Sequence, residues 1–327
     1  MESYTAGGSD KVARVLLENL KADKIFLLVN KSIDERIIFK KNFNSKIHVV
    51  KYRLITPMDI GIYANKFNSR KYIYFILKFT DYLVRYPLLL ISFFYFYFLM
   101  LRLNATHFFA HNGGYPGGLF CGTATIAAFF LPTIKYRFYA FHSMPFNLRK
   151  HLYLFDIIWD KLIDKSCKLI SVSKASSKQL LKLRFFKQDP FCIYNGLQIR
   201  NLKKYNKTKL IRILHVGYFD IIKNQIMLIK SLNLLMLSGI QNIKLTFVGE
   251  VNDLVVKNEI DEYIKLNNLS KYISFKGFQK DVEHYYETND VLVCTSKIES
   301  FPLAILEAMR VGMPIISTNV GGVNEQL

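Results

Sequence analysis

The sequence TSKIESFPLAILEAMRVGMPIIST, residues 295–318, decides the fold of this 327-residue chain. The run DVLVCTS at residues 290–296 leads into it as a predicted strand, and PIIST at residues 314–318 closes it as another. Between the two runs, Pro302 stands where a helix is expected to start, a position that suits its fixed φ and missing N–H group. A strand, a helix and a second strand in this order predict a βα unit of a parallel sheet.

The same alternation of short apolar runs and amphipathic stretches continues along the whole chain and predicts parallel sheets covered by helices. Residues 197–210, LQIRNLKKYNKTKL, are basic and poor in large apolar side chains other than leucine, which predicts an interdomain linker. We therefore expect two Rossmann-like domains, residues 1–196 and 211–327. The predicted strands span residues 24–30, 46–52, 107–111, 135–142 and 168–173 in the first domain and residues 211–217, 243–249, 272–277, 290–296 and 314–318 in the second.

Both ends of the sequence are expected to be interior positions of a longer protein. The chain opens on a Gly-Gly turn and a helix, without the strand that normally feeds such a turn in a doubly wound sheet. It stops at GGVNEQL, residues 321–327, where another helix is expected to begin. The sequence therefore predicts a fragment that is truncated at both ends, with an incomplete second domain.

Composition limits the classes of protein that this chain can belong to. Hydrophobic residues make up 51% of it, enough for two buried cores, so global disorder is excluded. The net charge of +20 would attract nucleic acid, nucleotide phosphates or anionic lipid. The amino terminus has no secretory signal, and no two cysteines form a Cys-x-x-Cys pair. We therefore expect a cytoplasmic location and four free thiols, Cys121, Cys167, Cys192 and Cys294.

The most apolar stretch is YPLLLISFFYFYFLML, residues 86–101. It is shorter than the roughly 20 residues that a spanning helix needs, so we expect a buried or interfacial helix. The basic residues in and around this region also suit attachment to an anionic bilayer at the inner face of the plasma membrane. A core helix of the first domain is the alternative explanation. The basic residues are Arg70, Lys71, Lys78, Arg85 and Arg102.

The loop and helix after residues 290–296 have the features of an anion site. The first free N–H groups of the helix, with the positive end of its dipole, point at the crevice beyond the strand ends, and this arrangement suits a diphosphate. Glu299 lies in the loop, and Glu307 follows eight positions later inside the helix, where its carboxylate can accept hydrogen bonds from a ribose diol. Taken alone, two glutamates on a helix are more simply explained as solvated charges.

The run ESFPLAILE, residues 299–307, resembles the Glu-x7-Glu signature of retaining glycosyltransferases of family 4, which have the GT-B architecture. The similarity continues through residues 308–327 and covers most of the chain in order. It implies that Glu307 binds the nucleotide ribose, that Glu299 lies beside the donor sugar, and that the main-chain N–H of Leu303 lies near the phosphates. Where the family often has glycine, Pro302 removes one phosphate donor. The implied donor-binding residues of this segment are Ser300, Phe301, Leu303 and Glu307.

The run HVGYFDIIKNQ, residues 215–225, resembles the first strand and loop of the family's donor domain. There an arginine and a lysine commonly clamp the diphosphate and stabilise the leaving group. Lys223 matches the lysine and Gly217 lies in the same loop, whereas Tyr218 stands at the arginine position. Without the neighbouring motifs, Lys223 would be explained as an ordinary surface lysine.

In the first half, AGGSDKVARVLLENL, residues 6–20, resembles the Gly-Gly-x-Glu turn and helix that approach the donor phosphates and the acceptor. Gly7 and Gly8 carry no Cβ and so allow a close backbone approach to a ligand, and Asp10 replaces the usual glutamate. The glycine-rich run HNGGYPGG, residues 111–118, resembles loops of bacterial members of the family. The expected acceptor-side residues are Gly7, Asn112, Gly113, Gly114 and Tyr115, and Gly8 is expected on the donor side.

His142, within FHSMP, stands where the family often has a histidine that faces the donor sugar. A structural histidine at a strand end is an equally good explanation. The chain contains no Asp-x-Asp pair, so we expect no bound metal and no cofactor, with Lys223 and helix N-termini meeting the charge on the diphosphate. No catalytic nucleophile is assigned. The candidates for catalysis are Glu299, His142 and Lys223.

The sequence thus predicts a retaining hexosyltransferase. It would move a sugar from a nucleotide-diphosphate sugar to a saccharide, expected to be lipid-linked, in bacterial surface polysaccharide or lipopolysaccharide biosynthesis. A GT-B nucleotide-sugar epimerase is one alternative, although the Glu-x7-Glu pattern argues against it. A non-catalytic basic protein that binds membranes or nucleic acid is another. No recognisable RNA-binding motif with stacked aromatics occurs, so nucleic acid is not an expected partner.

Overall fold

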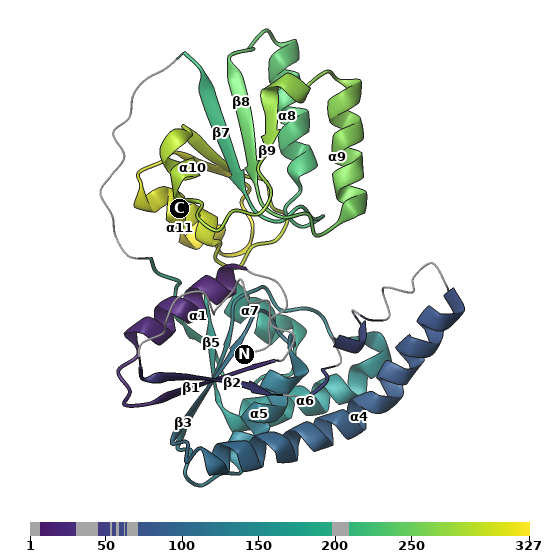
Figure 1. Ribbon diagram of the computed structural model, residues 1–327, viewed down its shortest axis with the longest axis vertical. Helices are drawn as coiled ribbons and strands as arrows, with labels where there is room; N and C mark the ends of the chain where they lie inside the picture. The colour runs from purple at the N-terminus through teal and green to yellow at the C-terminus, as the bar shows by residue number, and fades with distance from the viewer. Residues whose placement is uncertain are drawn as a thin grey trace. The chain divides into compact units, whose positions relative to one another are not determined.

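The computed structural model describes residues 7–30, 45–52, 54–56, 59–61, 63, 71–197 and 209–327. The chain divides into two compact units, Met1–Tyr194 and Asn195–Leu327 (Figure 1). Of the predicted linker, residues 197–210, only positions 197, 209 and 210 lie among the described residues. Each unit has its own sheets and its own core, so the two are treated separately below.

The second unit is built on a five-stranded sheet in the order β11-β10-β7-β8-β9, with every neighbouring pair parallel. The order reverses at β7, because β8 and β9 follow on one side of it and β10 and β11 on the other. Ligands of open α/β sheets bind outside the carboxyl ends of the strands at such a switch point. The strands are β7 (Ile211–Val216), β8 (Ile243–Val248), β9 (Ile273–Phe275), β10 (Val291–Cys294) and β11 (Ile315–Ser317).

Helices cover both faces of this sheet. Side chains alternate along each strand, so Phe247 of β8 packs with the core under α8 and α9, whereas Val248 packs with the core under α10 and α11. Figure 1 shows α8 and α9 side by side along β8 and β9. The helices are α8 (Gln225–Leu237), α9 (Leu254–Leu266), α10 (Glu283–Thr288) and α11 (Leu303–Arg310), with 3₁₀ turns η2 (Ser270–Tyr272) and η3 (Gly321–Glu325).

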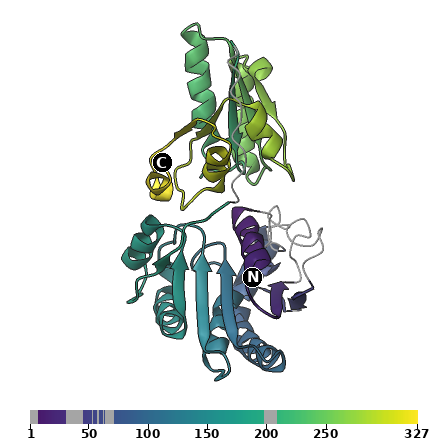
Figure 2. The same cartoon turned by 90° about the vertical axis from the view of Figure 1, so that its left-hand side faces the viewer.

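The first unit contains two parallel sheets, a pair β1-β2 and a four-stranded sheet in the sequential order β3-β4-β5-β6. Figure 2 shows the parallel arrows of the larger sheet with helices on both sides. The strands are β1 (Ile25–Asn30), β2 (Ile47–Tyr52), β3 (His107–Asn112), β4 (Tyr136–Phe141), β5 (Lys168–Ser171) and β6 (Phe191–Cys192).

The core of the first unit is organised around one helix, α5 (Leu119–Phe129), in which all residues except Phe129 are buried. It packs against both α4 (Lys71–Arg102) and α6 (Tyr153–Ser166). Gly122 permits the close contact with α6, because a Cβ at this position would lie 2.3 Å from Cζ2 of Trp159. The unit also contains α1 (Gly8–Asn19), α7 (Lys174–Leu183) and the short turn η1 (Lys150–Leu152).

All ten predicted strands are present, with their ends shifted by at most a few residues. The sequence analysis missed β6, because two residues are too few to give a period. It also missed the length of α4, whose first half contains charged residues that interrupt the apolar pattern, and Pro87 lies inside the helix. Among the described helices, α4 included, none has the length and apolar character that a bilayer crossing demands. The four cysteines are free thiols, as expected.

Candidate functional site

The loop after β7 positions Lys223. Oδ1 of Asp220 accepts hydrogen bonds from the main-chain N–H groups of Ile222 and Lys223, at 2.9 and 2.8 Å, which closes an Asx turn. The aliphatic stem of Lys223 runs over Gly217, where an added Cβ would lie 3.4 Å from its Cδ and Cε atoms. The residue types of this loop therefore direct the lysine, since Asp220 makes the turn and Gly217 leaves room for the stem.

Lys223 meets Glu299 at the switch point. Its Nζ donates to Oε1 of Glu299 at 2.5 Å, and Oγ of Ser296 donates to the same oxygen at 2.7 Å. Lys223 follows β7 and Glu299 follows the neighbouring β10, so the sheet order brings them together. Burial works against the charged lysine, but the adjacent Glu299 carboxylate outweighs it and holds the pKa of Lys223 above its ordinary value. The ammonium is therefore charged at neutral pH.

Neighbouring backbone braces this pair. The N–H of Lys297 donates to the carbonyl of Ile222 at 2.8 Å, which ties the loop after β10 to the loop after β7. Gly321 has φ +53°, and a Cβ there would lie 1.8 Å from the carbonyl oxygen of Glu299. The N–H of Gly322 donates to that same oxygen at 3.2 Å. Because the loops are fixed in this way, the charges are held in place before any ligand binds.

Glu307 lies inside α11 and is only 6% exposed, so it is not a solvated surface charge. Its Oε2 accepts a hydrogen bond of 2.8 Å from the hydroxyl of Tyr286 in α10. Burial and the nearby Glu307 carboxylate raise the pKa of Tyr286 well above its ordinary value, which keeps the phenol protonated as a donor. The sequence analysis missed Tyr286, because the adjacent tyrosines at 285 and 286 give no sign of which one turns inward.

The entrance to α11 is the expected anion site. Pro302 occupies the N-cap position and Leu303 is the first helical residue. Ser300 and Phe301 are 5% and 7% exposed, so their side chains pack inward and leave mainly the backbone of this turn for a ligand. Of the predicted donor-side residues, the second unit thus gathers Gly217, Lys223, Glu299 and the start of α11 around the ends of β7 and β10. Their roles stay predictions.

In the first unit, three predicted segments meet at the carboxyl ends of β3 and β4. Gly7 is the N-cap of α1, and its N–H donates to Oδ2 of Asp10 at 2.8 Å, so the aspartate in place of glutamate caps the helix. The N–H of His142 donates to the carbonyl of Gly113 at 3.3 Å. A Cβ on Gly113 would lie 3.9 Å from Oγ of Ser9, which places the glycine-rich loop beside the start of α1.

Two side chains of the glycine-rich loop turn into the protein. Asn112 is 2% exposed, and its Oδ1 accepts the N–H of Gly118 at 3.2 Å, which fixes the loop. Tyr115 is fully buried, and its hydroxyl donates to Asp160 at 2.8 Å. Unlike these two residues, Gly113 and Gly114 are only half-buried, so they remain partly accessible.

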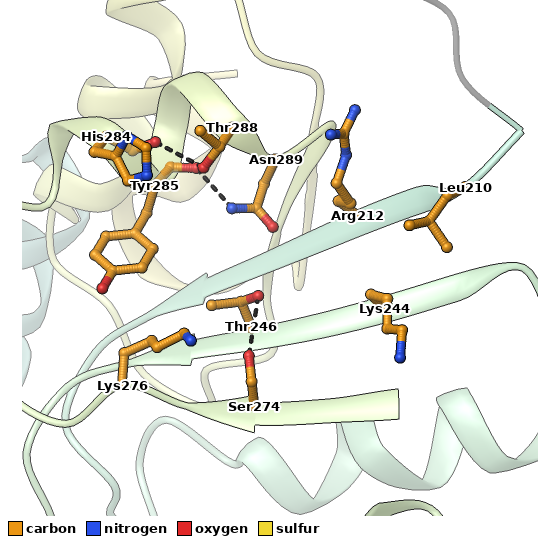
Figure 3. A pocket seen from close by; sticks show the side chains of 10 residues that line it. All are labelled: Leu210, Arg212, Lys244, Thr246, Ser274, Lys276, His284, Tyr285, Thr288 and Asn289. Atoms are coloured by element: carbon orange, nitrogen blue, oxygen red, sulfur yellow. Dashed lines mark hydrogen bonds between the residues drawn. The ribbon is translucent and has the colours of Figure 1, made fainter. Parts of the chain in front are cut away.

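A separate hollow of about 510 Å³ lies on the sheet face beside α10, and Figure 3 shows its lining side chains. Thr246 and Ser274 share a hydrogen bond of 3.3 Å across β8 and β9 at its floor. None of the predicted site residues lines it, so this hollow is distinct from the Lys223 and Glu299 pair. Its lining consists of Leu210, Arg212, Lys244, Thr246, Ser274, Lys276, His284, Tyr285, Thr288 and Asn289.

Comparisons with known proteins give matches for part of the sequence and for the fold. Residues 198–327 match the family model described as Glycosyl transferases group 1, and the match includes Lys223, Glu299 and Glu307. The capsular polysaccharide biosynthesis glycosyltransferase CapH of Staphylococcus aureus is 28% identical over 170 residues. That alignment covers 47% of this chain and 43% of CapH, so the chain spans less than half the length of this relative.

Solved structures share the fold over nearly the whole chain. The crystal structure of Anabaena HepE in complex with UDP and glucose has a TM-score of 0.71 and 17% identity, covering 99% of this chain and 81% of that chain. The lipopolysaccharide outer core galactosyltransferase WaaB has a TM-score of 0.59 and 16% identity, covering 98% and 80%. The predicted α/β fold of GT-B glycosyltransferases is therefore confirmed.

Proposed function

We propose that this protein is a retaining, metal-independent hexosyltransferase that uses a nucleotide-diphosphate sugar as its donor. The observation that carries the proposal is the convergence of Lys223 and Ser296 on Glu299 at the β7 and β10 switch point. An ammonium group has three N–H donors, so Lys223 can hold Glu299 and a diphosphate oxygen together. The diphosphate would also meet the N-terminus of α11, with Glu307 accepting from the ribose and Glu299 beside the sugar.

The acceptor is proposed to be a saccharide, lipid-linked, in the assembly of a surface polysaccharide. The name of CapH places that relative in capsular polysaccharide biosynthesis, and WaaB is a galactosyltransferase of the lipopolysaccharide outer core. HepE has been crystallised with UDP-glucose, which supports a uridine nucleotide sugar as the first donor to test. The loop at Gly113 and Gly114, where both residues are half-buried, is the proposed acceptor side.

Thermal unfolding in the presence of a panel of nucleotide sugars tests the donor class. One or more nucleotide-diphosphate sugars should raise the midpoint, since a ligand that binds only the folded state stabilises it. Transfer to saccharide acceptors, followed by NMR of the anomeric proton, should then give a product with the donor's configuration. A panel without any stabilising donor, or a product of inverted configuration, would contradict the proposal.

Removing divalent metal is expected to leave sugar transfer essentially unchanged. The sequence has no Asp-x-Asp pair, and Lys223 already supplies the positive charge at the proposed diphosphate position. Transfer rates are measured with and without EDTA after metal analysis shows that the protein is metal-free. Strict dependence on Mn²⁺ or Mg²⁺, restored by adding the metal back, would overturn the metal-independent mechanism.

Replacing Glu307 by glutamine is expected to weaken binding of the nucleotide sugar by roughly 1–3 kcal/mol, because a neutral amide accepts less strongly from ribose hydroxyls. Tyr286→Phe should weaken binding less, since it removes only the group that orients Glu307. Titration calorimetry measures both affinities. Glu287→Gln, at an exposed position of α10, is the matched control and should bind like the wild type. Unchanged affinity in Glu307→Gln would remove Glu307 from the site.

Binding to anionic vesicles is expected through the outer face of α4. Leu90, Phe94, Phe98 and Leu101 recur at helical spacing and are 49–61% exposed, which leaves an apolar stripe uncovered within the described unit. Replacing Phe94 and Phe98 by serine should reduce co-sedimentation with the vesicles. Salt should also weaken vesicle binding, because it screens the contribution of about 1 kcal/mol that each basic residue makes at the anionic surface. Absence of vesicle binding at low salt would contradict the proposed membrane attachment through α4. Arg70, which the sequence analysis included, lies outside the described residues.

A further inference from the structure

Two histidines of the first unit contact each other at the carboxyl edge of the four-stranded sheet. His111 lies near the end of β3, and His142 directly follows β4. Nε2 of His142 is 3.2 Å from Nδ1 of His111, and the ring centroids are 4.2 Å apart. The other nitrogen of His111, Nε2, lies 2.7 Å from the carbonyl oxygen of Ser9 in the first turn of α1. A chain of polar contacts thus joins α1 to His142 through His111.

The chemistry of these polar contacts shows which nitrogen atoms carry hydrogens. A carbonyl oxygen offers only lone pairs, so Nε2 of His111 carries a hydrogen. Burial, together with the neighbouring His142, holds the pKa of His111 well below its ordinary value, so its ring is neutral and Nδ1 is a bare acceptor. His142 must then donate from Nε2, whether its own ring is neutral or protonated. Its Nε2 is therefore committed to His111.

We propose that His111 is a positioning residue, which fixes the orientation of the His142 ring through the hydrogen bond to its Nε2. The inference rests on the proposed function and on the expectation from the sequence that His142 faces the donor sugar, and it adds a residue to which the sequence analysis gave no role. It also couples the Gly7 and Gly8 turn to His142, because the first turn of α1 and the His142 ring are held by the two nitrogens of one imidazole.

The position of His111 and His142 distinguishes this pair from a histidine with a purely structural role in the core. His215 is also buried, with Nδ1 2.9 Å from the carbonyl of Val293, and burial lowers its pKa to about 4. The His215 side chain belongs to β7, and it hydrogen-bonds to the backbone of the neighbouring strand β10. His111 and His142 instead lie where adjacent parallel strands end, and this is the edge at which α/β sheets bind ligands. An imidazole oriented by a second group is the usual arrangement of a functional histidine.

NMR of the whole chain with ¹⁵N-labelled histidine tests the hydrogen bond directly and needs no substrate. A scalar coupling between Nε2 of His142 and Nδ1 of His111, carried across the N–H···N hydrogen bond, is expected in the wild type. His111→Phe keeps a ring of similar size without nitrogens, so the coupling should vanish and the His142 nitrogen shifts should move. Circular dichroism and the thermal midpoint show that the variant is folded.

Kinetics of the same variants test the consequence. His111→Phe should lower kcat for sugar transfer by up to about a hundredfold, the effect of a misplaced group, with the KM for the donor close to the wild-type value. His111→Asn keeps an acceptor near the position of Nδ1 and should recover part of the loss. His107→Phe alters a histidine at the opposite end of the same strand and serves as the matched control.

The outcomes separate the two proposals. Absence of the coupling in the folded wild type overturns the positioning role of His111, and so does a His111→Phe enzyme with wild-type kcat. Equal losses in His111→Asn and His111→Phe would also contradict it, because they assign the loss to packing. A wild-type chain that transfers no sugar overturns the proposed function instead, while the coupling and its loss in His111→Phe still decide whether His111 fixes His142.

Discussion

Replacing Lys223 by alanine is expected to lower kcat for sugar transfer by about 10²- to 10³-fold, the range found when one charge-stabilising group is removed from an active site. Negative charge grows on the diphosphate as the glycosidic bond breaks, and the ammonium stabilises that charge more than it stabilises the bound donor. The Asx turn at Asp220 and the hydrogen bond to Glu299 hold the ammonium in place beforehand. The loss should therefore appear in turnover more than in ground-state binding.

Steady-state kinetics together with calorimetric donor affinities measure this effect. Lys230→Ala, seven residues later at an exposed position of α8, is the matched control and should keep wild-type kinetics. If donor affinity and kcat fall by the same factor in Lys223→Ala, the lysine anchors the donor without stabilising the leaving group.

Replacing Arg184 by methionine is expected to destabilise the first unit by about 3–5 kcal/mol, the cost of leaving buried charges unpaired. The Arg184 side chain has no exposed surface, and its Nη2 donates to Oδ1 of Asp160 at 2.7 Å. Nη1 reaches Oδ2 of Asp156 at 3.3 Å. Asp156 would keep its partner Arg149, but Asp160 would be left with hydrogen bonds to neutral groups only, among them the hydroxyl of Tyr115.

Urea unfolding followed by the fluorescence of Trp159 measures this loss. Trp159 is the single tryptophan of the chain and is buried in α6, so its signal reports on the first unit separately from the second. Arg14→Met removes an exposed ion pair with Glu18 in α1 and should change stability by less than about 1 kcal/mol. A similarly small change in Arg184→Met would mean that the surrounding structure relaxes around the two carboxylates.

Sequence reasoning proposed the candidate site in the second unit from the family resemblance and from the loops that follow predicted strands. Lys223 and Glu299 are 76 positions apart, yet each lies in the loop after a strand, and the doubly wound order makes those strands neighbours. The hydrogen-bond partner of Glu307 was not predicted from the sequence. The hydroxyl of Tyr286 reaches Glu307 only because α10 and α11 pack on the same face of the sheet.

The sequence by itself determined the alternation of strands and helices, the division into two series of βα units, and the placement of Lys223, Glu299 and His142 after strands. These features depend on side-chain periodicity and on turn-forming residues, which act between neighbours along the chain. Only the tertiary structure decided that Glu307 is buried and that His111 contacts His142. Such contacts join segments that are distant in sequence, and they follow from how helices pack and which way each side chain turns, which a local pattern does not encode.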